Sequence, residues 1–349
     1  MPNEKISKDK VKKIVIFRTD RIGDILLSIP AIRALKQSFF KAQISVVLQL
    51  PYACLLEENA DIDEIITYDK KKDGGFWGTL KFIAHLRKKG FDLAVILNPK
   101  KRSNIIAFLA GIPHRLGYSR KWGFLLNYRI KDEKYKGEKH ELEYNLDLVG
   151  AIGAETEDKS FSVGIKEEDE DFIDFLFKES RIKNGEQLIA IHPGSSCPSK
   201  RWPIERFSRL AQSAKRKAQS AEIVIIGSKE EKELGQTMER LMQVPAINLT
   251  GKLNLGQLAA LFKRCSLLIS TDSGPVHLAT AVGLRCVVIF GRNLPGLSPK
   301  RWGPRGENDI VLHNPPDCQP CLAHRCKKGF ECLKRISVEE MLRVANLEV

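Results

Sequence analysis

The chain has 349 residues, of which 43% are hydrophobic and 29% are charged, a composition typical of a soluble globular protein with room for two domains. No apolar run approaches the roughly 20 residues of a membrane-spanning helix. Residues 1–13 are polar and rich in lysine, and they lack the apolar stretch of a signal peptide. We therefore expect a cytoplasmic protein.

Basic residues outnumber acidic ones, and the excess is concentrated in the first half of the chain. The net charge is +14, and residues 1–150 carry 28 Lys and Arg against 18 Asp and Glu, whereas the remainder carries 29 against 25. This basic half of the chain would attract an anionic partner, which could be a membrane surface, an acidic small molecule or nucleic acid. The alternative is a solvated basic face without a partner. Because aromatic residues make up only 7% and no nucleic-acid-binding motif is present, we expect no nucleic-acid partner.

Strands and helices alternate in the first half, which predicts a parallel sheet with helices on both faces. The expected strands are 11–17, 44–48, 64–68 and 93–97. The expected helices are 22–39, 77–88 and 139–150. Pro30 must lie in the first turn of a helix or kink it.

The second half repeats this alternation after a junction near residue 160. The expected strands are 188–191, 222–226, 246–249, 267–270 and 286–290. The expected helices are 203–217, 230–242, 255–263, 275–282 and 338–347. We therefore predict domains at 1–163 and 164–335, followed by a C-terminal segment, 336–349, that could pack back on the first domain.

Ligands of open parallel sheets bind beyond the carboxyl ends of the strands, and the first such turn is Arg18-Thr19-Asp20-Arg21-Ile22-Gly23-Asp24. It lacks the G-x-G-x-x-G of dinucleotide sites and the G-x-x-x-x-G-K-[ST] of P-loops, which disfavours a dehydrogenase or an NTPase. Asp24 could cap the following helix or act as a catalytic base, and the local sequence supports both readings.

Two turns of the second half carry groups suited to a nucleotide. The run His192-Pro193-Gly194-Ser195-Ser196 is followed by Lys200-Arg201 before a helix, which offers backbone N–H groups and positive charge to a phosphate. An ordinary loop with surface cations is the alternative. Glu230 and Glu231 follow another strand, where they could receive ribose hydroxyls or simply occupy a helix N-terminus.

The fourth turn, Thr271-Asp272-Ser273-Gly274-Pro275-Val276-His277, has the strongest signature. Gly274 allows a ligand close to the backbone, Pro275 suits the first turn of a helix, and the helix N-terminus attracts a diphosphate. Asp272 suits sugar hydroxyls better than phosphate, and His277 lies one turn into the helix.

Two further patterns point to metals. The strings Asp61-Ile62-Asp63 and Asp169-Glu170-Asp171 match the D-x-D motif that binds a metal–diphosphate in some sugar transferases. Acidic residues are also common at helix N-termini, and we favour this structural interpretation over a metal site. Four of the eight cysteines have tetrathiolate-like spacing, a pattern that fits zinc or a reduced surface loop: Cys318, Cys321, Cys326 and Cys332.

Taken together, the runs 18–24, 110–118, 192–194, 200–203 and 271–277 resemble glycosyltransferase family 9, the ADP-heptose:lipopolysaccharide heptosyltransferases. The resemblance covers nearly the whole chain, and the four-cysteine loop is similar to that of heptosyltransferase II-type members. It implies the α/β GT-B fold, with two Rossmann-like domains facing a central cleft. The first domain would bind the acceptor and the second the nucleotide-sugar donor.

The resemblance also implies an activity and a set of site residues. Heptose would pass with inversion from ADP-L-glycero-D-manno-heptose to the lipid A–Kdo or heptosyl-Kdo inner core of lipopolysaccharide, with Asp24 as the base and no required cofactor. The implied donor-binding residues are Ser195, Ser196, Lys200, Glu230, Glu231, Asp272, Ser273, Gly274 and His277. The candidate acceptor-binding residues are Arg18, Arg21 and Arg120.

A lipid-linked acceptor implies peripheral association with the anionic cytoplasmic face of the inner membrane. Two alternatives remain open at this point. One is a GT-B enzyme that acts on another nucleotide sugar as a transferase or an epimerase, and the other is a non-catalytic binder of anionic glycans.

Overall fold

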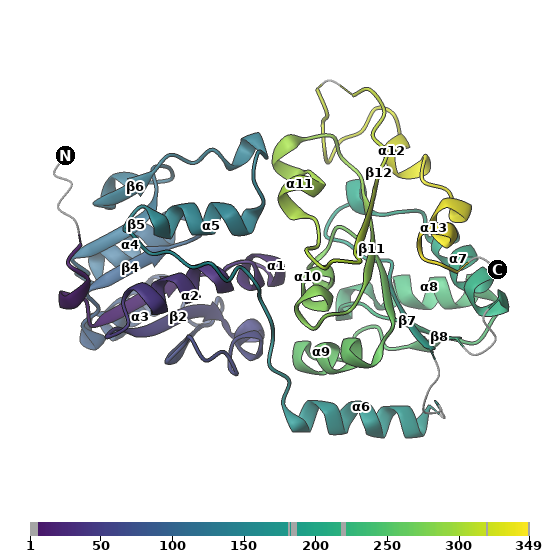
Figure 1. Cartoon of the computed structure of the whole chain (residues 1–349), viewed down its shortest axis with the longest axis horizontal. Coiled ribbons are helices and arrows are strands. Elements are labelled where there is room, and N and C mark those ends of the chain that lie inside the picture. Colours follow the sequence, from purple (N-terminus) through teal and green to yellow (C-terminus); the bar gives the residue numbers. More distant parts are fainter. Residues whose placement is uncertain (1–5, 181, 183–186, 218–220, 319, 348–349) are drawn as a thin grey trace. The chain divides into compact units, whose positions relative to one another are not determined.

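The computed structural model describes residues 6–180, 182, 187–217, 221–318 and 320–347. The first five residues of the polar leader lie outside this part of the chain. The chain divides into two compact units, Met1–Gly164 and Ile165–Val349, next to the junction that the alternation of elements predicts. Each unit contains one parallel β-sheet with helices on both faces (Figure 1).

The sheet of the first unit has the strand order β3-β2-β1-β4-β5-β6. The strands are β1 (Lys13–Phe17), β2 (Gln43–Gln49), β3 (Glu64–Tyr68), β4 (Leu93–Ile96), β5 (His114–Tyr118) and β6 (Tyr128–Ile130). The central strand β1 pairs in parallel with β2 and β4, with Ile14 opposite both Ile44 and Leu93. Strand order therefore reverses direction between β1 and β4, the position at which Rossmann-like sheets bind ligands.

Five α-helices cover this sheet in the described part of the first unit. They are α1 (Ile22–Leu26), α2 (Ile29–Ser38), α3 (Phe76–Lys89), α4 (Lys101–Leu109) and α5 (Glu141–Gly150). Helix α2 packs on α5, whereas α3 and α4 pack together with one hydrophobic core of the sheet. The helix expected at 22–39 is interrupted, and Pro30 lies in the first turn of α2, where its missing N–H costs no helical hydrogen bond. Short 3-10 turns occur at Lys8–Lys10 (η1), Leu50–Leu55 (η2), Gly123–Leu125 (η3) and Lys134–Lys136 (η4).

The sheet of the second unit has the order β12-β11-β10-β7-β8-β9, which repeats the topology of the first. The strands are β7 (Gln187–His192), β8 (Ala221–Ile225), β9 (Ile247–Asn248), β10 (Leu267–Thr271), β11 (Cys286–Phe290) and β12 (Ile310–His313). Here the switch point lies between β7 and β10, which pair in parallel. Both units thus confirm the prediction of Rossmann-like α/β domains.

The helices of the second unit form two groups. Helices α7 (Ile204–Lys217), α8 (Lys232–Met242) and α13 (Val338–Val344) contribute to one core, and α6 (Glu167–Glu179) and α10 (Gly274–Ala281) both contact α9 (Leu255–Arg264). Short helices occur at Pro299–Trp302 (α11) and Glu331–Lys334 (α12). The 3-10 turns are Pro198–Lys200 (η5), Lys229–Glu231 (η6) and Pro295–Leu297 (η7).

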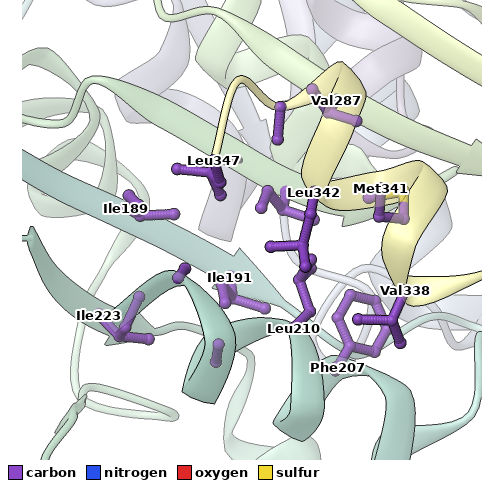
Figure 2. Close-up of a cluster of buried hydrophobic side chains, with 14 of the residues drawn as sticks. Ile189, Ile191, Phe207, Leu210, Ile223, Val287, Val338, Met341, Leu342 and Leu347 are labelled. Atoms are coloured by element: carbon purple, nitrogen blue, oxygen red, sulfur yellow. The ribbon is translucent and has the colours of Figure 1, made fainter. Parts of the chain in front are cut away.

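The C-terminal segment 336–349, which the sequence allowed to pack back on the first domain, contains helix α13. Val338, Met341 and Leu342 of this helix are buried in the core of the second unit. Figure 2 shows them beside Phe207 and Leu210 of α7. The hydrophobic side chains of α13 face the core of the second unit, and their burial there stabilises the position of the helix.

Candidate functional site

In the first unit, the turn after β1 and the segment after β4 meet because these strands are neighbours in the sheet. Asn98 joins the two segments, since its amide Nδ2 donates to Thr19 Oγ1 and to Asp20 Oδ1, both at 3.1 Å. Lys100 Nζ lies 2.5 Å from the same Asp20 oxygen. The sequence-predicted turn therefore lies at the switch point of this sheet.

Arg18 is the centre of a buried charge cluster, with only 1% of its surface exposed. Its Nε donates to the backbone oxygen of Asp24 at 2.8 Å, and its Nη2 lies 3.5 Å from Asp24 Oδ1. Asp20 and Glu141 approach the guanidinium at 3.5 and 3.6 Å, and Lys134 Nζ lies 2.6 Å from Glu141. Three carboxylates thus share one arginine, and Arg18 fixes both the backbone and the side chain of Asp24.

The electrostatic setting of Asp24 suits a proton acceptor. Burial raises the pKa of Asp24, Arg18 opposes this, and the carboxylates of Asp20 and Glu141 add to the rise, so the net direction is upward. The side chain nevertheless keeps 23% of its surface exposed, so it is accessible from solvent. A carboxylate with a raised pKa is a stronger base than an ordinary aspartate.

The three arginines predicted to bind the acceptor have different environments. Arg18 is buried and donates to the backbone oxygen of Asp24, so its contacts are with this cluster, and acceptor binding by Arg18 stays a prediction. Arg21 is exposed at the N-cap of α1. Arg120 is half-exposed and pairs with Asp132 at 2.7 Å. Arg21 and Arg120 remain predictions for acceptor binding.

The switch point of the second unit has the opposite charge arrangement. Asp272, which follows β10, is 8% exposed and lies between two cations. Lys200 Nζ is 2.7 Å from Asp272 Oδ2, and Arg292 Nη2 is 2.8 Å from the same oxygen. Lys200 also donates to the backbone oxygen of Asp272 at 3.1 Å. Arg292 was missed from the sequence, although its position two residues after the apolar strand β11 marks it as a carboxyl-end residue.

A second network connects the turns that follow β7, β8 and β10. His192 Nδ1 lies 3.1 Å from Ser273 Oγ, and its Nε2 lies 3.3 Å from Glu231 Oε2. Partial burial raises the pKa of Glu231, but the His192 contact and the hydrogen bonds from Ser228 outweigh it and lower the pKa to about 2. Gly194 lies close to this network, because a Cβ at this position would overlap the Glu231 carboxylate and force that side chain to shift.

The N-terminus of α10 has the features expected of an anion site. Ser273 is the N-cap, Gly274 begins the helix and a proline lies in its first turn. The hydroxyl of Ser273 lies 3.0 Å from Ser270 Oγ. His277 is buried one turn further, with its ring edge-on to Trp302 at 6.5 Å between centroids.

The remaining donor candidates lie on the neighbouring turns. Ser195 is buried, with its hydroxyl donating to the Cys197 oxygen at 2.9 Å, whereas Ser196 is exposed. Glu230 is exposed at the helix start, and Glu231 closes a capping box with Ser228. Glu231 therefore has a structural role in addition to any contact with a ribose, and the binding roles of these residues remain predictions.

The patterns that suggested metals have local structural roles or lack metal-site geometry. Asp63 accepts hydrogen bonds from the Ile44 N–H and from Lys36, both at 2.7 Å, and Asp169 packs against Gly256 of α9. Within the described ranges, no group of three or more His, Cys, Asp or Glu side chains is placed to hold a metal ion. Zinc in the cysteine loop stays a prediction that this geometry does not support.

The cysteine loop instead forms a wall beside the Asp272 cluster. A cavity of about 220 Å³ is lined by Ser199 and Arg292 on one side and by the loop on the other. All four loop cysteines line it: Cys318, Cys321, Cys326 and Cys332. Cys321 Sγ accepts from the Asn293 N–H at 3.3 Å, so the loop is joined to the residue next to Arg292.

Comparison with known proteins agrees with this geometry. The family model described as glycosyltransferase family 9 (heptosyltransferase) matches residues 79–330, more than half of the chain. The lipopolysaccharide core heptosyltransferase OpsX of Haemophilus influenzae is 26% identical over 86% of this chain and 84% of its own. The lipooligosaccharide heptosyltransferase 2 of Campylobacter jejuni is also 26% identical, over 95% and 97%. A solved family 9 glycosyltransferase of Veillonella parvula superposes with a TM-score of 0.86 at 27% identity and covers 96% of both chains.

Two Rossmann-like units, a partly buried carboxylate at one switch point and a helix N-terminus beside paired cations at the other fit a glycosyltransferase. The chain belongs to glycosyltransferase family 9, the heptosyltransferases.

Proposed function

We propose that this protein is an inverting heptosyltransferase of lipopolysaccharide inner-core assembly. Its donor would be ADP-L-glycero-D-manno-heptose, and its acceptor lipid A–Kdo or heptosyl-Kdo. The observation that carries the proposal is the contrast between a carboxylate of raised pKa at one switch point and paired cations beside a helix N-terminus at the other. The first suits proton removal from an alcohol, and the second suits a departing diphosphate.

In the proposed reaction, Asp24 takes the proton of the acceptor hydroxyl while that oxygen attacks the anomeric carbon of the donor. The new glycosidic C–O bond forms on the face opposite the leaving group, and the bond between the anomeric carbon and the phosphate oxygen breaks. ADP departs with the electron pair of that bond. Each preorganised group that stabilises the leaving charge contributes on the order of 3 kcal/mol.

The second unit would stabilise that charge. The N–H groups of Ser273 and Gly274 at the start of α10 would face the diphosphate, and Lys200 would add a positive charge. Asp272 would accept hydrogen bonds from hydroxyls of the heptose while Arg292 holds its carboxylate in place. The proposed steps use no metal ion.

The rest of the site is assigned by position. Ser195, Ser196 and His277 would complete the donor pocket, and Glu230 and Glu231 would lie near the ribose. Arg21 and Arg120 would meet the acidic groups of the acceptor. A lipid-linked acceptor would place the protein at the cytoplasmic face of the inner membrane.

The test is ADP release from a panel of sugar nucleotides, each offered with and without truncated lipopolysaccharide acceptors. We expect release with ADP-heptose only when an inner-core acceptor is present. Conversion of the donor without acceptor would identify an epimerase, release with another sugar nucleotide would change the donor, and no release with any pair would leave a non-catalytic glycan binder.

A further inference from the structure

Exposed aromatic side chains and lysines gather at the start of α3. Phe76 and Trp77 are 72% and 74% exposed, and Leu80 on the next turn is 40% exposed. Residues i, i+1 and i+4 of a helix lie on one side, so these three side chains form one apolar surface. Lys70, Lys71 and Lys72, in the turn before the helix, and Lys81 within it are also exposed.

A second surface of the same chemistry lies at the turn 119–124. Trp122 is 45% and Phe124 is 68% exposed, and Lys101 Nζ lies 5.3 Å from the centroid of the Trp122 ring. Lys121 and Trp122 both have positive φ, of 48° and 69°, which is unfavourable for residues with a side chain. Such a conformation persists only where its surroundings enforce it, and here Asn104 Nδ2 donates to the Lys121 oxygen at 3.1 Å.

The start of α4 joins these two surfaces. Lys101 contacts Trp122, and its neighbour Arg102 donates to the backbone oxygens of Asp73 and Gly74 just before α3. Helix α4 also packs against both α3 and η3. We call the combined surface the aromatic rim: Lys70–Lys72, Phe76, Trp77, Leu80, Lys101 and 121–124.

The aromatic rim lies at the same edge of the sheet as Asp24. Its segments follow the carboxyl ends of β3, β4 and β5, and Asp24 follows that of β1. All these strands run parallel, so their carboxyl ends share one edge. Bare aromatic rings surrounded by lysines therefore border the side of the unit that carries the proposed base.

We propose that the aromatic rim docks the protein on an anionic lipid bilayer. Trp and Phe partition into the interface between headgroups and acyl chains, while lysines are attracted to acidic headgroups. No helix within the described ranges is long and apolar enough to span a membrane, so docking would use this surface. The inference deepens the proposed function, on which it rests, by naming the surface that brings Asp24 to a lipid-anchored acceptor.

The test is co-sedimentation of the full chain with vesicles of phosphatidylcholine that contain about 30 mol% phosphatidylglycerol, which provides an anionic surface that attracts lysines. We expect wild-type protein to bind these vesicles and to lose most binding on pure phosphatidylcholine or in high salt. F76S/W77S should weaken binding by about tenfold or more because two interfacial aromatic rings are lost. K70S/K71S/K72S should weaken it by roughly a hundredfold, at about fivefold for each lysine.

Matched controls exist at the opposite edge of the same sheet. Phe40 is 71% exposed and has Lys41 Nζ 5.4 Å from its ring centroid, but it precedes the amino end of β2. F40S and the triple variant K12S/K41S/K88S, whose lysines precede the amino ends of β1, β2 and β4, should bind as wild type. Equal losses in rim and control variants, or full binding by F76S/W77S, would overturn the proposal.

These vesicles contain no acceptor, so the result is independent of the transfer reaction. In catalysis, F76S/W77S should lower kcat/KM for a bilayer-embedded acceptor by about tenfold, in proportion to the loss of docking. The same variant should leave kcat/KM for a deacylated, soluble acceptor unchanged. Equal losses on both acceptors would show that the aromatic pair binds the acceptor glycan instead. Vesicle binding without any ADP release would keep the docking surface and reject the proposed function.

Discussion

The two Rossmann-like units have the same strand order but opposite charge arrangements at their switch points. In the first unit, Asp20, Asp24 and Glu141 surround one buried arginine, Arg18. In the second unit, Lys200 and Arg292 flank one buried carboxylate, Asp272. One topology thus carries the proposed proton acceptor in one copy and the proposed anion site in the other.

The fold therefore determines where a site lies, whereas a few side chains determine its chemistry. A surplus of carboxylates makes an aspartate a stronger base, because each neighbouring negative charge raises its pKa. Two cations pair with the single carboxylate of Asp272, so this cluster has a net positive charge, as the proposed diphosphate site requires. The following predictions test each half of that contrast, from the largest effect to the smallest.

Replacement of the proposed base should have the largest effect. Asp24→Asn should lower kcat by roughly 10²–10⁴-fold because proton transfer is lost, while calorimetry should find the affinity for ADP unchanged. Asp61→Asn is a matched control, since Asp61 is 25% exposed and lies 3.4 Å from Arg33, close to the values for Asp24. Near-normal turnover by Asp24→Asn would remove the base from the first unit.

Removal of the lysine in the second unit should come next. Lys200→Met should lower kcat by about 10²–10³-fold, because charge on the departing diphosphate loses a preorganised partner, and it should also weaken ADP binding. Lys215→Met is the control, because Lys215 is similarly buried and paired with Glu222 but lies at the far end of α7. If both variants lost the same activity, the loss would come from structure and the anion site would be refuted.

Arg18→Gln should change how activity depends on pH. Arg18 opposes the rise in the pKa of Asp24, so its removal should raise that pKa further and move the acidic limb of the kcat/KM profile to higher pH. Lost activity should then recover in part at higher pH. Arg120→Gln, which breaks the ion pair of a half-exposed arginine with Asp132, should leave the limb in place. A uniform loss at every pH would mean that Arg18 acts only on stability.

The smallest effect concerns the Glu231 network of the second unit. Its pKa in the folded protein, about 2, is below the ordinary 4.5, so its contribution to stability is present above pH 4.5 and is lost as the pH falls toward 2. Because the side chain is partly solvated, we expect Glu231→Gln to reduce the free energy of unfolding by about 1 kcal/mol at pH 7. Urea titrations should show this difference shrinking progressively below pH 4.5, and a difference that was undiminished at pH 3 would contradict the assignment.

Much of the fold and several site turns were predictable from local patterns. Strands such as Glu64–Tyr68 and Cys286–Phe290 coincide with apolar runs bounded by polar turns. The D-S-G-P run at the start of α10 is typical of a helix N-terminus. By contrast, β5, β6, β12 and α4 were not expected. Strand β6 has only three residues and β12 is only half-buried, so neither has a clear hydrophobic signal, and α4 begins with the polar run Lys101–Asn104.

The sequence by itself determined the two α/β halves, the family resemblance and the turns that hold Asp24, Lys200 and Asp272. Only the tertiary structure decided how those turns are assembled. Glu141 and Arg292 lie far along the chain from the groups they contact, and nothing in the local sequence indicated that Arg18, a candidate acceptor-binding residue, is buried. Hydrophobic periodicity is a local property of the chain, whereas the burial and pKa of a charged group depend on partners that only the pairing of distant strands brings together.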